Sequence, residues 1–165
     1  MALFHRPPRA PDDVRDRLDL TTHRPLAVGR LTDGWAAATV TGLRVLVGEH
    51  VLARPWSDVN TARLDPDSLE LTVTWVDGAT PTVLHLTDDS RALPRAVHDR
   101  VQSSVVHSET VPVPHGQSAR VVLRRAAGGE LFTQVIGTGG VDLGDPTVAA
   151  AVDAAEARVR EAAGL

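Results

Sequence analysis

Residues 54–76, RPWSDVNTARLDPDSLELTVTWV, decide how the middle of this chain folds. Over residues 68–75 apolar and polar side chains alternate strictly, which is the period of a β-strand with one buried face. Asp77-Gly78 follows at once and favours a two-residue hairpin turn, and residues 80–87 supply a returning strand. The stretch predicts an antiparallel β-meander. The residues expected on the buried face are Leu69, Leu71, Val73 and Trp75.

Short apolar runs also precede this stretch. They read LAVGRL from residue 26, WAAATVT from residue 35 and LRVLVG from residue 43, with a further strand at residues 50–54. Only tight polar turns separate them, so antiparallel pairing is expected. Pro55 cannot donate to a strand ladder, which places it at a strand start or a sheet edge.

The pattern becomes helical after Thr87. Asp88, Asp89 and Ser90 offer capping oxygens, and an apolar stripe then recurs every four residues. This predicts a helix across one face or one open end of the sheet. The stripe comprises Leu93, Val97, Val101 and Val105.

The two ends of the chain carry further elements. Residues 1–11 predict an irregular arm, and Asp12 a cap for a short helix with Val14 and Leu18 on one side. Residues 106–113, 120–125 and 131–136 predict three strands, with a turn at Gly128-Gly129. Asp145-Pro146 is a strong helix start, with Glu156 and Arg160 expected as a pair on the wet side of that helix. Its apolar stripe is Val148, Val152, Ala155, Val159 and Ala162.

Composition limits the class of protein. A length of 165 residues suits one domain, and a net charge of −4 gives no general reason to expect nucleic acid or an anionic membrane as partner. The chain has no cysteine, which excludes disulfides, thiolate nucleophiles and cysteine metal sites. No signal-peptide core or membrane-length apolar run is visible, so a soluble cytoplasmic protein with no integral membrane segment is expected. Peripheral lipid contact is possible but not indicated.

About seven antiparallel strands followed by a helix is the order of a pleckstrin-homology-like (PH-like), or GRAM-like, domain. Leu26-Ala27 with Asp33-Gly34, and the run RPWSDV from residue 54, carry this resemblance locally. The whole chain, including RVQSSVV from residue 100, VVLRR from residue 121 and Asp145-Pro146, resembles an uncharacterised family of actinobacterial proteins. This resemblance implies a fold and brings no established activity.

The expected fold class is α+β and mainly antiparallel β, a PH-like β-barrel or sandwich with a capping helix. We expect a single domain over residues 1–165: an arm at 1–11, a PH-like core at 24–106, and an extra hairpin and C-terminal helix at 107–165 packed on the core. Whether these last residues complete the first sheet or form a subdomain stays open at this point.

Arginines supply two candidate contact sites. Arg30 and Arg44 flank the first hairpin loop and suit bidentate recognition of phosphate or carboxylate, although solvated arginines at strand ends look the same. Arg120 and Arg124, with Arg125 beside them, share a strand that could meet an acidic partner or form a wet hairpin face. Trp56 is either a core residue or a partly exposed anchor.

Catalytic, cofactor and metal sites are not indicated. Seven histidines stand singly without ligand spacing, no serine lies in a GxSxG elbow, and the glycines of IGTGGVDLGDP lack phosphate-loop spacing. Asp88-Asp89 reads more simply as a helix cap than as an acid–base pair.

Three functions remain open. The leading hypothesis is a non-enzymatic protein-interaction or scaffolding module that binds a partner protein or itself. The second is a small-ligand or lipid-binding domain with an apolar pocket between sheet and helix near Val97 and Val101. The third is an enzyme with a cleft that collects His85, Asp88 and Asp89.

Overall fold

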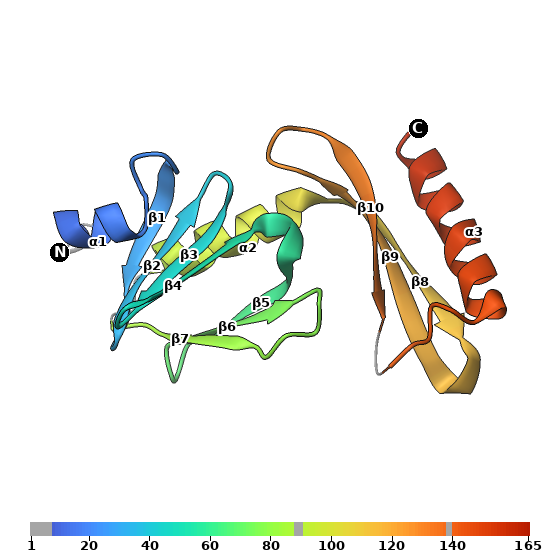
Figure 1. Cartoon of the computed structure of the whole chain (residues 1–165), viewed down its shortest axis with the longest axis horizontal. Helices are drawn as coiled ribbons and strands as arrows, with labels where there is room; N and C mark the ends of the chain where they lie inside the picture. The colour runs from blue at the N-terminus through green and yellow to red at the C-terminus, as the bar shows by residue number, and fades with distance from the viewer. Residues whose placement is uncertain (1–7, 88–90, 138–139) are drawn as a thin grey trace. The chain divides into compact units, whose positions relative to one another are not determined.

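A computed structural model describes residues 8–87, 91–137 and 140–165. The chain divides into an N-terminal unit, Met1–Gln102, and a C-terminal unit, Ser103–Leu165. In Figure 1 the elements of the first run from blue to yellow, and those of the second from gold to red. The single domain expected from the sequence stays a prediction.

The first sheet of the N-terminal unit is a four-stranded antiparallel meander. Its strands, in spatial order, are β1 (Pro25–Arg30), β2 (Gly34–Thr39), β3 (Gly42–Val47) and β4 (His50–Pro55). The strands predicted over residues 26–54 are therefore confirmed. Glycine is required at the start of β3, because a Cβ atom on Gly42 would lie 2.2 Å from the carbonyl oxygen of Arg54 on β4.

The second sheet contains the strand that the sequence signals best. Its strands, in spatial order, are β5 (Val59–Asp65), β6 (Glu70–Trp75) and β7 (Thr82–His85). Along β6 every second residue is buried, as the alternation predicts. Leu69 does not extend this strand: the Asp65 carboxylate accepts hydrogen bonds from the backbone N–H groups of Asp67 and Ser68, and Leu69 closes the turn at φ 56°.

The hairpin between β6 and β7 forms, but its turn is not the predicted two-residue turn. Only Gly78 has positive φ (74°), while a turn of that kind at Asp77-Gly78 needs positive φ at both residues. The strands pair from Val73 and Thr82 onward, and Trp75 Nε1 donates to Thr82 Oγ1 at 3.2 Å. The longer loop leaves Asp77 available to a side chain of the first sheet.

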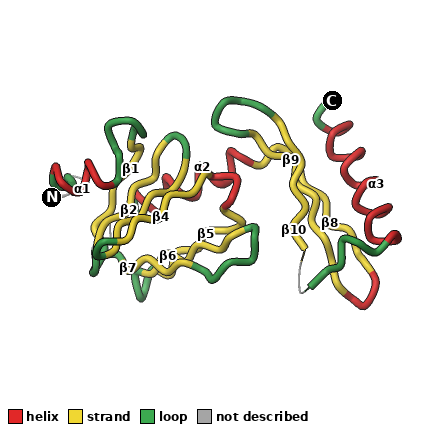
Figure 2. Tube along the Cα trace, viewed as in Figure 1, coloured by secondary structure: helices red, strands yellow, loops and turns green. Residues whose placement is uncertain are grey.

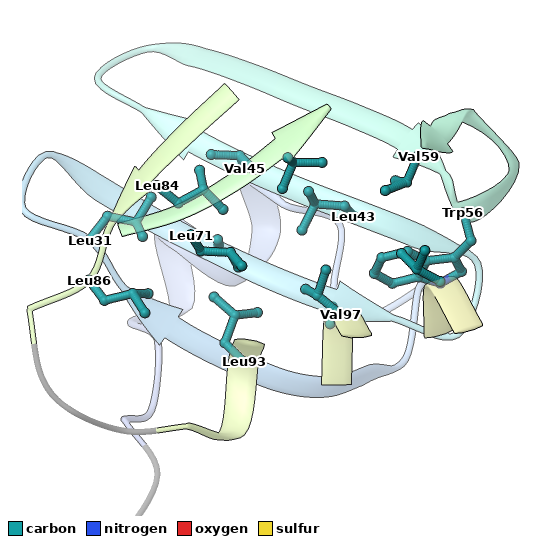
Figure 3. Packing of buried hydrophobic residues seen from close by; sticks show 14 of the residues in the cluster. Leu31, Leu43, Val45, Trp56, Val59, Leu71, Leu84, Leu86, Leu93 and Val97 are labelled. Carbon is teal, nitrogen blue, oxygen red and sulfur yellow. The ribbon is translucent and has the colours of Figure 1, made fainter. Parts of the chain in front are cut away.

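Helix α2 (Ala92–Ser104) packs against both sheets of the N-terminal unit. Leu93, Val97 and Val101 are buried in one hydrophobic cluster with residues of both sheets, which confirms the predicted stripe up to residue 101. Val105 belongs instead to the first strand of the C-terminal unit. Figure 3 shows Leu93 and Val97 pointing from α2 into the space that the two sheets enclose.

The two sheets do not close into a barrel, which was one of the two expected arrangements. Among the described residues, their ladders meet only at an isolated bridge between Leu31 and Leu86. At the opposite corner, Pro55 ends β4 without an N–H group, and the 3₁₀ turn η1 (Trp56–Asp58) leads the chain into β5. The result is two facing antiparallel sheets with α2 packed against both, within the predicted α+β class.

A short helix covers the outer face of the first sheet. In α1 (Asp12–Arg17) the cap position is Pro11, so the predicted cap at Asp12 is wrong by one residue. Val14 and Leu18 are buried as predicted, in a small cluster with Ala37 and Leu46 of the sheet.

The C-terminal unit has two layers, a three-stranded sheet and a helix, and among the described residues its strands pair only with one another. Its sheet has the order β10 (Leu131–Gly137), β9 (Gln117–Arg125), β8 (Val105–Val113), with η2 (Pro114–Gly116) between β8 and β9. These strands therefore do not complete the first sheet. Helix α3 (Pro146–Ala162) packs on one face of this sheet (Figure 2).

The start of α3 follows the predicted chemistry. The Asp145 carboxylate accepts hydrogen bonds from the backbone N–H groups of Thr147 at 2.7 Å and Val148 at 3.3 Å, which confirms it as the N-cap. Glu156, expected to pair with Arg160, instead accepts a hydrogen bond from the Thr133 hydroxyl on β10.

Candidate functional site

An open groove lies in the N-terminal unit between α2 and strands β5 and β6. It encloses about 340 Å³. The strands contribute apolar side chains, and the segment that begins just before α2 contributes one proline, two arginines and one histidine. The lining residues are Ala62, Leu64, Leu71, Arg91, Pro94, Arg95 and His98.

The helical period explains why α2 can both fill the core and line the groove. Residues 91, 94, 95 and 98 recur at the spacing of one helix face, immediately beside the stripe of residues 93, 97 and 101. The stripe packs into the core. The neighbouring face therefore lies at the border of the core, on the side of the helix that is next to β5.

Strand β5 forms the other side of the groove and is an edge strand. It pairs with β6 on one side, and no other strand in the part of the chain that the structure describes pairs with it. Ala62 and Leu64 are half-buried on the inner face, whereas Thr61 and Arg63 are exposed on the outer face. The groove therefore runs beside backbone groups that can accept another strand.

The rim of the groove is basic. Arg91 and His98 are exposed, and the Arg95 side chain is 82% exposed. Arg95 Nε lies 3.8 Å from Asp99 Oδ2, and that carboxylate is 64% exposed, so water weakens the pair. Within residues 8–87, 91–137 and 140–165, neither Asp nor Glu lines the groove.

The groove lies beside the position that the sequence suggested for a pocket. Val97 and Val101 are themselves core residues, 0% and 7% exposed, and the opening is bordered by Pro94 and His98 instead. For the enzyme hypothesis, His85 Nδ1 lies 3.2 Å from Glu70 Oε1, and Asp88 and Asp89 lie outside the described residues.

Arg30 and Arg44 have different surroundings. The guanidinium of Arg30, at the end of β1, lies 6.0 Å from the ring centroid of Trp35 on β2. Arg44 Nε donates to the Leu18 carbonyl oxygen at 2.5 Å, and its Nη2 lies 3.9 Å from Asp19 Oδ2. Arg44 therefore anchors the segment after α1 to the sheet.

A smaller hollow of about 230 Å³ lies next to Arg44. His23 in its wall shares a hydrogen bond with the Thr41 hydroxyl at 2.9 Å and lies 3.5 Å from Asp19. Carboxylate or carbonyl oxygens already lie next to the basic groups of this hollow. Those groups are therefore less available to a ligand than the basic groups of the groove. Its lining residues are His23, Thr41, Gly42, Leu43, Arg44, Ala53, Arg54 and Pro55.

The other residues that the sequence suggested as contact residues also lie in different surroundings. Trp56 is 6% exposed and its Nε1 donates to the Thr39 carbonyl oxygen at 3.0 Å, so it is a core residue and not an exposed anchor. Arg124 is fully buried and donates to Ser104 Oγ at 2.8 Å, whereas Arg120 is half-buried. Burial of Arg124 removes it from the predicted contact surface for an acidic partner.

Arg54 was not selected from the sequence and is the centre of a charged cluster. It donates to Asp58 Oδ2 at 3.1 Å and to Asp77 Oδ2 at 2.6 Å, and its guanidinium lies 4.5 Å from the ring centroid of Trp75. The cluster joins the end of β4 to η1 and to the loop after β6. The hydrogen bond from Arg54 is the main cause that holds the pKa of Asp77 below its ordinary value.

This cluster predicts a loss of stability in acid. Since the folded-state pKa of Asp77 is lowered, its stabilising contribution is present above the unfolded-state pKa and is lost as the pH falls through the folded-state pKa. We expect Asp77→Asn to be less stable than the parent at neutral pH, and the two to converge as the pH falls from neutral to below the lowered folded-state pKa of Asp77. Urea unfolding at several pH values measures this.

The matched control for that experiment is Asp67→Asn, which removes the same charge from an exposed turn. An unchanged gap between Asp77→Asn and the parent protein across this pH range would contradict the assignment.

Neither a cluster of metal ligands nor a membrane-spanning helix is present in the described ranges. Within residues 8–87, 91–137 and 140–165, no three His, Asp or Glu side chains gather as metal ligands would. Of the helices in those same ranges, none combines the length and apolar character needed to cross a bilayer.

The basic groove face is the functional feature that sequence reasoning missed. Its signal was present, because Arg91, Arg95 and His98 follow helical spacing beside the apolar stripe. Comparison of the chain with protein-family models, with curated proteins and with solved structures gave no match.

Proposed function

We propose that the N-terminal unit is a PH-like interaction module that binds an extended segment of a partner protein in the groove between β5 and α2. Its role is binding and not catalysis. A sheet of four strands, a sheet of three and a following helix are the order that the resemblance to PH-like domains implies, and they support that part of the proposal.

One observation carries the binding role: an apolar groove runs directly beside an edge strand. An extended peptide can add a strand to such an edge through main-chain hydrogen bonds, while its alternate side chains enter the neighbouring groove. Ala62 is the smallest strand side chain in the lining, so its position leaves the most room for such a side chain.

A small ligand is the second candidate for the same groove. A volume of about 340 Å³ falls at the lower end of the usual range for ligand sites, about 300–1,000 Å³. Native mass spectrometry of the gently purified protein distinguishes the candidates, because a retained small mass would favour the ligand and a complex with a second polypeptide would favour the module.

The decisive variant is Ala62→Trp, which places a large side chain in the groove. Short random peptides displayed on phage are selected on the parent protein, and the affinities of the selected peptides are measured by fluorescence anisotropy. We expect Ala62→Trp to weaken binding at least about tenfold, because the indole occupies the space that a peptide side chain would fill.

Thr61→Trp is the matched control, since it adds the same side chain to the exposed face of the same strand. The control should bind like the parent protein. Unfolding midpoints of both variants exclude loss of the fold as the cause. Failure to select any peptide, or equal binding by Ala62→Trp and Thr61→Trp, would refute the proposed module.

A further inference from the structure

We infer that the segment taken by the groove is acidic, with carboxylate side chains that meet Arg91 and Arg95. This inference rests on the proposed function and names the chemistry of its partner. It follows from the groove combining an apolar floor with a basic helix wall.

The two arginines stand where carboxylates of a bound segment could reach them. Arg91 immediately precedes α2 and its carbonyl oxygen accepts a hydrogen bond from the backbone N–H of Arg95 in the first turn, and both residues line the groove. Arginine presents a planar fork that binds a carboxylate through two hydrogen bonds. The Arg95 side chain is 82% exposed, and its pair with Asp99 at 3.8 Å is a weak competitor.

The charge of the groove contrasts with that of the chain. The whole protein has 21 acidic and 17 basic side chains, for a net charge of −4, whereas the described residues that line the groove include two arginines and one histidine and no acid. An acidic segment would therefore be repelled by much of the surface and attracted at this face. Complementarity of this kind favours one docking position and speeds association.

A polypeptide fits these features better than a nucleic acid. The floor is formed by Ala62, Leu64 and Leu71, which offer an apolar surface to side chains. The neighbouring strand edge offers peptide N–H and C=O groups, which pair with another peptide backbone. A net negative protein also lacks the general attraction that phosphate backbones require.

The test compares peptides selected from a random phage library on three proteins. These are the parent, the double variant Arg91→Glu/Arg95→Glu, and the control Arg17→Glu/Arg24→Glu. The control makes the same change of charge at two exposed residues on or near α1. All the substituted positions are exposed, so each variant should fold, and unfolding midpoints check this.

We expect peptides selected on the parent and on the control to be rich in Asp and Glu, and those selected on Arg91→Glu/Arg95→Glu to be rich in Lys and Arg. A peptide from the parent selection should bind Arg91→Glu/Arg95→Glu at least about tenfold more weakly, and its affinity for the parent should fall with salt.

Three results would overturn the inference. The first is peptides that need Ala62 but are neutral or basic, in which case the proposed module stands without an acidic partner. The second is acidic peptides that bind Ala62→Trp and the parent with equal affinity, or a selection that yields no peptide. Either outcome also refutes the proposed module. The third is a random single-stranded DNA that binds the parent and the control but does not bind Arg91→Glu/Arg95→Glu.

Discussion

Trp56→Ala is expected to lower the free energy of unfolding by about 3–5 kcal/mol, the range for removal of a buried aromatic side chain. Trp56 is 6% exposed and belongs to the cluster that both sheets and α2 share. Its position in η1 is the corner where the chain passes from one sheet to the other. The substitution therefore removes packing at the join, together with the hydrogen bond to the Thr39 carbonyl oxygen.

Trp56→Phe separates these two contributions. Phenylalanine keeps most of the apolar packing and loses the indole N–H, so a smaller loss of about 1–2 kcal/mol is expected. Urea unfolding followed by circular dichroism and by the fluorescence of the remaining tryptophans measures both variants. A loss below about 1 kcal/mol for Trp56→Ala would show that this corner is not part of the packed core.

Val159→Asp is expected to destabilise the C-terminal unit by about 4 kcal/mol, the order of cost of an unpaired buried charge, or to unfold it. Val159 is 0% exposed and packs from α3 against the sheet of that unit. A carboxylate at this position would be buried without a partner, which costs several kcal/mol. The hydrophobic face of α3 would then lose its fit to β8 and β9.

Ala157→Asp is the matched control, because it adds the same carboxylate to an exposed position of the same helix. It should unfold like the parent protein, and equal stabilities of the two variants would contradict the packing of α3. All three tryptophans of the chain lie in the N-terminal unit. Circular dichroism compared with tryptophan fluorescence therefore also tests whether the two units unfold together, as a single domain would.

Local patterns predicted many of the elements well. The alternation along β6, the stripe of α2 and the Asp145 cap of α3 each depend on residues within a few positions of one another. Turn details were less predictable. Asp77-Gly78 looked like a two-residue turn, yet Asp77 instead binds Arg54, 23 residues earlier in the chain.

The candidate site was predictable only in part. The sequence suggested a pocket between a sheet and the helix near Val97 and Val101, and a groove lies beside that position. It named Val97 and Val101, which face the core, because the apolar stripe is the stronger helical signal. The arginine candidates were selected by their position at strand ends, which does not reveal that Arg44 would bind the Leu18 carbonyl or that Arg124 would be buried.

The sequence by itself determined the antiparallel strands, the buried stripe of α2 up to Val101, the buried stripe of α3 up to Val159 and the cap of α3. These follow from side-chain period and from hydrogen bonds between near neighbours. Ala162, which was predicted to continue the α3 stripe, is exposed. Only the tertiary structure decided that the two sheets stay open, that Arg54 links three segments and that Ala62 faces Arg91 and His98 across a groove. The physical reason is that these outcomes depend on which of several similar faces is covered when segments far apart in the chain pack together.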